Sequence, residues 1–303
     1  MDMSCELVLK FKRKKMQKIV RPPTLNPACH PAGRSEPVNA YKILNNFLSY
    51  LSIFLLTLVL GCAPLVPFPS AKPFSQQESV RLISNLQDQE GKVYSFQGVG
   101  KLRFKKGEEE TETNLFAVGC MPFKVRLEIT HPWGRPLLYI VADERNISVL
   151  SLTDNKFFRG PPNSLKIKQF FLCGLDLDLA WIIFSGRVPI LSAAGGAVSL
   201  KPYEISLYNK QGEIIETISF SSRTLLPKSA YFPKKGFTII LSEFKEGDLG
   251  LHPLKIKILK EDEDQSAEIR YKSLKLNKPV PKEIFQLNPP PNFEIIKLNY
   301  QQN

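Results

Sequence analysis

The chain has 303 residues, of which 43% are hydrophobic and 10% aromatic. This is ample for a packed core, so disorder is not the default. A formal charge of +12 suggests nucleic-acid binding as a candidate function. Half of this excess of positive charge lies before residue 62, however, and many later Lys residues alternate with apolar ones. Such alternation is typical of the solvent-facing side of half-buried strands, so we expect no nucleic-acid partner.

The first part of the chain predicts an export signal. Residues 1–42 carry a basic cluster followed by Pro and Gly, which indicates a disordered leader or a start codon assigned too early. Residues 43–61 have no charge, and their apolar centre runs for 14 residues from Phe47 to Leu60. This length suits the hydrophobic region of a signal peptide, since a membrane-spanning helix needs about 20 residues. An uncleaved signal anchor is the alternative, because basic residues precede the segment.

The apolar segment ends in Val59-Leu60-Gly61-Cys62, which resembles the lipobox of bacterial lipoproteins. The resemblance implies cleavage between Gly61 and Cys62, with a covalent diacylglyceryl and N-acyl lipid on Cys62 and no other cofactor. Two or more acyl chains anchor a protein stably where one is marginal. Ala63 follows the cysteine where an Asp would resemble an inner-membrane retention signal. We therefore expect anchoring in the outer membrane, facing the periplasm.

A folded domain is expected over residues 75–295. Residues 62–74 contain the lipidated cysteine and a Pro-rich tether, and residues 296–303 form a tail. Ser75 stands at a helix N-cap position with Glu78 three residues on, and an apolar stripe follows as far as Leu86, which predicts one amphipathic helix.

After this helix the apolar residues alternate with a period of two, which predicts a mainly β (α+β) fold built on an antiparallel meander. Between Leu165 and Leu191 the spacing becomes helical, and we expect two short apolar helices interrupted at Gly174. Strands are expected at residues 94–104, 113–120, 123–129, 137–142, 146–152, 157–158, 203–208, 213–220, 237–242, 254–259 and 267–276.

Four motifs in order carry a family resemblance: Phe96–Gly100, Pro122–Glu128, Gly186–Pro189 and Pro281–Pro290. Together with the lipobox and the order of elements, they resemble the LolA/LolB-like lipoprotein-carrier superfamily over about residues 75 to 295. The resemblance implies a strongly curved antiparallel sheet that forms an incomplete barrel, with one N-terminal helix. It also implies a short helical lid over an apolar cavity that accepts acyl chains.

The inner face of such a sheet must be filled by side chains, a helix or a ligand. The resemblance further implies an envelope protein that handles lipids or lipoproteins, with membrane lipids, lipoprotein acyl chains and a periplasmic carrier as partners. The alternative is a non-catalytic, lipid-tethered subunit of an envelope assembly that docks a partner protein. The residues expected to line the cavity are Phe96, Phe104, Val125, Leu127, Leu138, Phe170, Phe171 and Trp181.

No catalytic residue and no metal site are expected. His131 and His252 each precede a proline at a predicted strand end or turn, and no nucleophile motif surrounds a serine. The five cysteines show no CxxC spacing. After export Cys120 and Cys173 are left, either as a disulfide or as two buried thiols.

Overall fold

The computed structural model describes residues 71–162, 175–191, 195–260 and 264–299, and the elements named below belong to one compact unit of the chain. None of the helices within these ranges is long and apolar enough to cross a membrane. In chain order the elements are α3 (Gln76–Gly91), β1 (Ser95–Lys106), β2 (Glu109–Cys120), β3 (Lys124–Thr130), β4 (Pro136–Asp143), β5 (Ile147–Ser151), β6 (Lys156–Gly160), α5 (Leu177–Phe184), β7 (Gly196–Val198), β8 (Glu204–Tyr208), β9 (Ile214–Phe220), β10 (Pro227–Phe232), η2 (Pro233–Lys235), β11 (Phe237–Gly247), β12 (Gly250–Lys260), β13 (Gln265–Leu276), η4 (Lys282–Phe285) and β14 (Glu294–Lys297).

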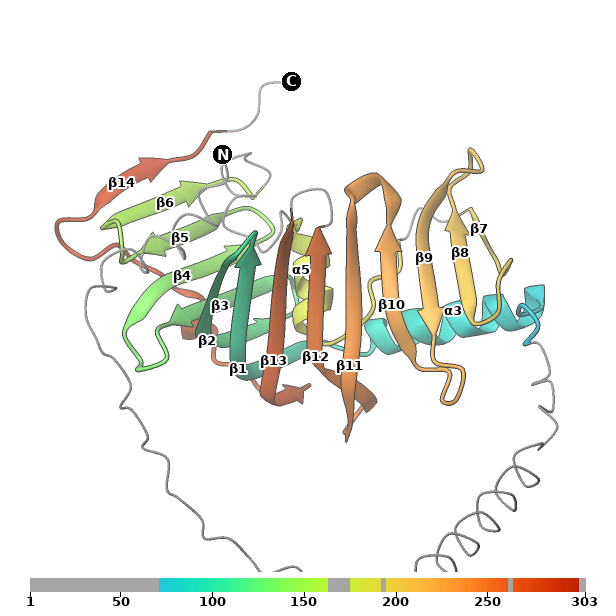
Figure 1. The fold of residues 1–303 in the computed structure, drawn as a ribbon. Coiled ribbons are helices and arrows are strands. Elements are labelled where there is room, and N and C mark those ends of the chain that lie inside the picture. The colour runs from blue at the N-terminus through green and yellow to red at the C-terminus, as the bar shows by residue number, and fades with distance from the viewer. Residues whose placement is uncertain (1–70, 163–174, 192–194, 261–263, 300–303) are drawn as a thin grey trace, which may run out of the picture. The chain divides into compact units, whose positions relative to one another are not determined.

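The strands form one sheet in the order β14-β6-β5-β4-β3-β2-β1-β13-β12-β11-β10-β9-β8-β7. The long β1–β13 pair joins the two halves of the chain, and each half continues outward as an antiparallel meander. Only β14 pairs in parallel, with β6. The described sheet does not close, since β7 and β14 are its two edges (Figure 1). The prediction of a mainly β, largely antiparallel and unclosed sheet with an N-terminal helix is confirmed.

The sheet turns strongly along its length. In Figure 1, β4, β5 and β6 run across the direction of β11 and β12. Right-handed twist accumulates over so many strands, and the β1–β13 register shifts between Val99 and Gly100. A Cβ atom on Gly100 would collide with the backbone of Arg270 and Tyr271. Glycine is therefore required where the two halves of the sheet approach most closely.

The N-terminal helix begins as its sequence predicts. The Ser75 hydroxyl accepts a hydrogen bond from the Glu78 amide, and the Glu78 carboxylate accepts one from the Ser75 amide at 2.8 Å. This reciprocal pair is a capping box, which satisfies amide groups that have no partner within the helix. The helix α3 packs with few buried side chains, chiefly Ser79 and Ile83.

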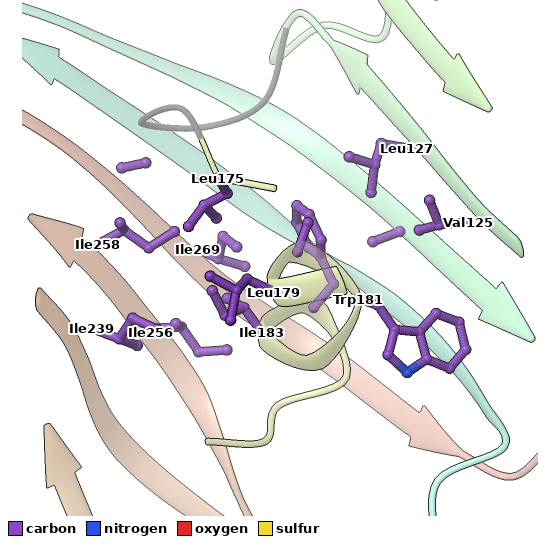
Figure 2. Packing of buried hydrophobic residues seen from close by; sticks show 14 of the residues in the cluster. Val125, Leu127, Leu175, Leu179, Trp181, Ile183, Ile239, Ile256, Ile258 and Ile269 are labelled. Carbon is purple, nitrogen blue, oxygen red and sulfur yellow. The ribbon is translucent and has the colours of Figure 1, made fainter. Parts of the chain in front are cut away.

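The core lies on one face of the sheet, where α5 packs on the strands (Figure 2). The α5 side chains Leu179 and Ile183 lie beside the isoleucines of β12 and β13, while Trp181 lies toward β1 and β2. The ring centroids of Trp181 and Phe96 are 4.9 Å apart. The buried hydroxyl of Tyr271 donates a 2.9 Å hydrogen bond to the Phe184 carbonyl oxygen, so β13 holds the last residue of α5.

Three described strands were not predicted from the sequence. The strand β7 has three residues, and β10 begins with a proline and has little apolar alternation. The strand β14 follows a run of prolines and pairs with a strand more than 130 residues earlier. Such segments become strands because they pair with a neighbouring strand. The local sequence does not reveal this pairing, so it does not predict the strand. Of the two helices expected between Leu165 and Leu191, α5 is the second, and the first falls outside the described residues.

Candidate functional site

Some of the predicted functional residues fall outside the described part of the chain. These are the cleavage and lipidation residues Gly61 and Cys62, and the predicted cavity residues Phe170 and Phe171. The leader, the signal segment and residues 62–70 of the tether likewise lie before the described part. These interpretations stay predictions.

The other six predicted cavity residues belong to one buried cluster of apolar side chains. In it, Trp181 packs between Phe96 and Phe123, with the Phe123 centroid 5.7 Å away. None of the six lines either of the two pockets described below. Their role in contacting an acyl chain stays a prediction. The six residues are Phe96, Phe104, Val125, Leu127, Leu138 and Trp181.

A pocket of about 130 Å³ lies instead farther along the sheet, between α3 and β9–β12. From α3 it is lined by Leu82 and Leu86, with Asn85 and Gln89 at the helix surface. Most of the remaining lining is apolar, and the chief exception is Arg187, which follows α5. The other lining residues are Gly186, Val188, Phe220, Leu225, Leu226, Pro227, Leu241, Phe244, Leu251 and Pro253.

The end of α5 places Arg187 in this pocket. The Gly186 amide donates to the Ile183 carbonyl oxygen at 3.0 Å, and the Arg187 amide donates to the Ile182 carbonyl oxygen at 3.1 Å. These two bonds form a Schellman motif, which ends a helix with a residue in the left-handed region. Gly186 has a φ of 72°, and a Cβ atom there would press on the Leu274 side chain. Glycine is therefore required for the turn that directs the chain toward the β11–β12 hairpin.

The Arg187 guanidinium is buried without an acidic partner. The residue is only 4% exposed. Its Nη1 and Nη2 groups donate long hydrogen bonds of 3.4 and 3.3 Å to the carbonyl oxygens of Leu251 and Leu249 at the hairpin. The buried Nε atom has no hydrogen-bond partner, and no ion pair of Arg187 is present among the described residues. Burial lowers the pKa of Arg187, and no carboxylate of the described ranges opposes that effect.

A second buried basic residue, His252, belongs to the β11–β12 hairpin that Arg187 contacts. His252 is buried, and burial is the main reason that its pKa is lowered, with the charges of Arg187 and Lys245 acting in the same direction. His252 lines a separate pocket of about 210 Å³ at the hairpin end. Four lysines also line this second pocket, and one of them, Lys278, forms a 2.6 Å ion pair with Asp248. The hairpin thus separates an apolar pocket from a basic one.

One buried carboxyl group, that of Glu216, belongs to β9 in the half of the sheet that borders the first pocket. Glu216 on β9 accepts a 3.1 Å hydrogen bond from the Leu191 amide, while its Oε1 atom has no partner. Burial raises the pKa of Glu216 to about 8, and the charge of Glu90 contributes in the same direction. Burial also raises the pKa of Glu90 itself. Glu216 is therefore mainly protonated at neutral pH and is not a counter-ion for a cation.

The remaining reactive groups do not form a chemical site. No group of His, Cys, Asp and Glu within the described ranges is arranged to hold a metal ion. Cys120 is a free, half-buried thiol whose pKa is raised by burial, and its possible partner Cys173 is outside the described residues. Arg187 belongs to the Gly186–Pro189 motif, but no local pattern in the sequence indicates a role for it. Its burial beside an apolar pocket depends on the hairpin, which lies about 60 residues later in the chain.

No family model matches the chain, and no curated protein matches it. Among solved structures, it is similar to a LolA superfamily protein from Nitrosomonas europaea, at 14% identity and a TM-score of 0.48, over 69% of this chain and 97% of that one. It is also similar to a putative outer membrane lipoprotein-sorting protein domain from Vibrio parahaemolyticus, at 7% identity and a TM-score of 0.42, over 70% and 97% of the two chains.

A third similar structure is the Mycobacterium tuberculosis lipoprotein LppX, at 11% identity and a TM-score of 0.28, over 68% of this chain and 99% of that one. The similar solved structures thus include one named for the LolA superfamily and one named for lipoprotein sorting. Identities and TM-scores this low concern the fold alone.

Proposed function

We propose that the protein is a lipid-anchored lipoprotein of the outer membrane, facing the periplasm, which binds acyl chains and takes part in lipid or lipoprotein handling. The anchoring part of the proposal is supported by the 14-residue apolar run that ends at Gly61-Cys62, followed by the Pro-rich tether. The binding part is supported by the pocket between α3 and the sheet. No catalytic step is part of the proposal.

The anchor is tested by growing cells with a palmitate analogue and comparing labelling of the wild type with that of Cys62→Ala. Loss of the label in Cys62→Ala, together with retention in Cys120→Ala, supports the anchor. Equal labelling of Cys62→Ala and wild type contradicts it. Separation of inner and outer membranes by density then shows which membrane carries the labelled protein.

The observation that carries the binding proposal is the predominantly apolar lining of the pocket under α3. Transfer of methylene groups from water into such a lining is favourable by about 0.8 kcal/mol each, and it needs no directional contacts. Asn85 and Gln89 lie at the helix surface, so this side of the pocket borders water and a ligand can enter there. An acyl chain fits these requirements better than a polar metabolite.

The size of the pocket limits how binding takes place. Its volume of about 130 Å³ is below the roughly 300 Å³ at which typical small-molecule sites begin. A whole acyl chain therefore requires the site to widen. The element that covers it is α3, which buries few of its own side chains and exposes 52% of Val80. We infer that α3 moves outward when a chain enters.

The binding test uses the full chain in a non-ionic detergent with a photoreactive palmitate, followed by mass spectrometry of the labelled peptides. We expect labelling of peptides from α3 and from β9–β12. Leu86→Trp fills the pocket and reduces this labelling by about tenfold or more. Val80→Trp introduces the same side chain on the exposed side of the same helix, so its labelling stays at the wild-type level.

Absence of pocket labelling in the wild type contradicts acyl-chain binding at this site. Equal labelling of Leu86→Trp and wild type also contradicts it, provided that both have the same thermal unfolding midpoint. In either case the alternative of a lipid-tethered docking subunit is favoured, and co-purification of a defined envelope protein becomes the measurement to make.

A further inference from the structure

We propose that Arg187 binds the anionic end of an acyl ligand, so that the pocket under α3 selects a carboxylate or phosphate joined to an acyl chain. This inference rests on the proposed function, because it concerns the same pocket. It goes further in naming the charge of the ligand and the residue that recognises it.

The first support is the absence of a counter-ion. A buried cation is costly unless it is paired, and arginines in protein interiors are normally hydrogen-bonded to an acid. Arg187 is 4% exposed and forms no ion pair with any described residue. Glu216, a buried carboxyl group on β9, accepts a hydrogen bond from the Leu191 amide and has no electrostatic interaction with Arg187.

The second support is the unused hydrogen-bonding capacity of the guanidinium. Arginine has five N–H donors in a planar fork that matches the two oxygens of a carboxylate or phosphate. In Arg187, two long bonds to Leu249 and Leu251 use part of this set, and Nε has no partner. A neutral donor can also form two long bonds to carbonyl oxygens, so bracing the hairpin does not by itself account for a buried charge.

The third support is the position of the charge. Arg187 belongs to the lining of a pocket that is otherwise mostly apolar, so a ligand there meets one cation and many methyl and methylene groups. The nearby Lys245 adds to the positive potential at the hairpin, where its charge and that of Arg187 both lower the pKa of His252. In a medium of low dielectric constant one such charge strongly favours an anion over a neutral group of the same size. An amphipathic anion satisfies both parts of the lining.

A fatty-acid carboxylate and a lipid phosphate share this chemistry, and the experiment separates them. The full chain in non-ionic detergent is exposed to three photoreactive probes with the same sixteen-carbon chain: palmitate, hexadecyl phosphate and hexadecanol. Labelling of the pocket peptides is quantified by mass spectrometry. In the wild type we expect at least one anionic probe to label the pocket about tenfold more strongly than the alcohol, and the stronger anion identifies the head group.

Arg187→Met removes the charge but keeps an unbranched apolar side chain. We expect it to lose the preference for the anion while labelling by hexadecanol persists, and we expect Arg187→Lys to keep part of the preference. The matched control is Arg223→Met, because Arg223 is an exposed arginine two residues from the pocket residue Leu225. We expect Arg223→Met to keep the wild-type preference for the anionic probe over the alcohol.

The outcomes distinguish the two proposals. Wild-type labelling by the alcohol that equals labelling by both anions overturns the anion site but leaves acyl-chain binding intact. If Arg187→Met keeps the full preference for the anion, the anion site is likewise overturned and acyl-chain binding is left intact. Absence of pocket labelling by all three probes overturns both proposals. The wild-type comparison of probes needs no variant, so it stands even if Arg187→Met unfolds.

Discussion

The indole ring of Trp181 on α5 covers Gly119 on β2, and no side chain at position 119 separates the helix from the sheet. A Cβ atom on Gly119 would collide with both Trp181 and Phe96, whose rings pack edge to face at 4.9 Å. The glycine therefore sets how closely α5 approaches the strands.

Gly119→Ala should destabilise the protein. The added methyl group has to displace two large buried rings, and overpacking of this kind costs about 1–3 kcal/mol. Urea unfolding measures the change. Gly196→Ala is the control, since a Cβ atom on Gly196 meets nothing within 4 Å. Equal midpoints for the two variants would contradict the packing of α5 on β2.

Tyr271→Phe should loosen the attachment of α5. The variant removes the buried hydroxyl that donates to the Phe184 carbonyl oxygen, and loss of one such bond costs about 1–2 kcal/mol. Tyr231→Phe removes a hydroxyl from a residue that is 43% exposed, so its unfolding free energy should stay close to that of the wild type. Chemical denaturation of the three proteins side by side provides the comparison.

Glu216 should make the stability depend on pH. Its folded pKa of about 8 lies above the usual value of 4.5, so between these values the folded state keeps a proton that the unfolded state has released. The contribution of Glu216 to stability is therefore largest below this window and is lost as the pH rises through it. A tenfold change in proton affinity corresponds to about 1.4 kcal/mol, which gives a loss of roughly 4 kcal/mol between pH 5 and 9.

In Glu216→Gln this loss should largely disappear, because glutamine accepts the same Leu191 hydrogen bond without ionising. Urea unfolding at pH 5, 7 and 9 measures the difference from the wild type. Glu144→Gln, at an exposed turn position, should leave the wild-type pH dependence unchanged. A Glu216→Gln protein with the same pH profile as the wild type would show that the carboxyl group is not buried.

The two tryptophans should report opposite surroundings. Trp181 is 5% exposed, whereas Trp133 is 76% exposed and stacks on His131 with centroids 4.3 Å apart. In Trp133→Phe the remaining emission should be blue-shifted and resist quenching by iodide, because its source is buried. In Trp181→Phe the emission should be red-shifted and strongly quenched. The reverse order would mean that α5 does not cover the sheet.

Local sequence patterns were sufficient for most of the sheet. In β3 the strict alternation of Val125, Leu127 and Ile129 with polar residues predicts a strand with one buried face, and the structure buries these three side chains. The helix α3 was equally predictable, because its capping box lies within four consecutive residues. Signals of this kind depend only on neighbours in sequence, and β7, β10 and β14 lack them.

The candidate site was harder to predict from the sequence than the sheet. The apolar positions of α5 and β3 could be identified, but which of them fill the core and which border a pocket depends on how helices far apart in the chain pack on the sheet. Arg187 illustrates the limit. A single arginine after a helix is ordinarily a surface residue. Its burial follows from the hairpin carbonyl oxygens of Leu249 and Leu251, which no local pattern associates with it.

The parallel strand β14 covers what would otherwise be an edge of the sheet. An unpaired edge strand is a template on which another chain can add, and β6 would be such an edge if β14 did not occupy it (Figure 1). Arg126 holds the preceding segment in place by donating to the carbonyl oxygens of Ile284 and Gln286. The opposite edge, β7, is only three residues long. The two edge strands of this wide sheet are thus short, so they expose few unpaired backbone groups on which another chain could add. The C-terminal strand β14 covers the edge that β6 would otherwise expose.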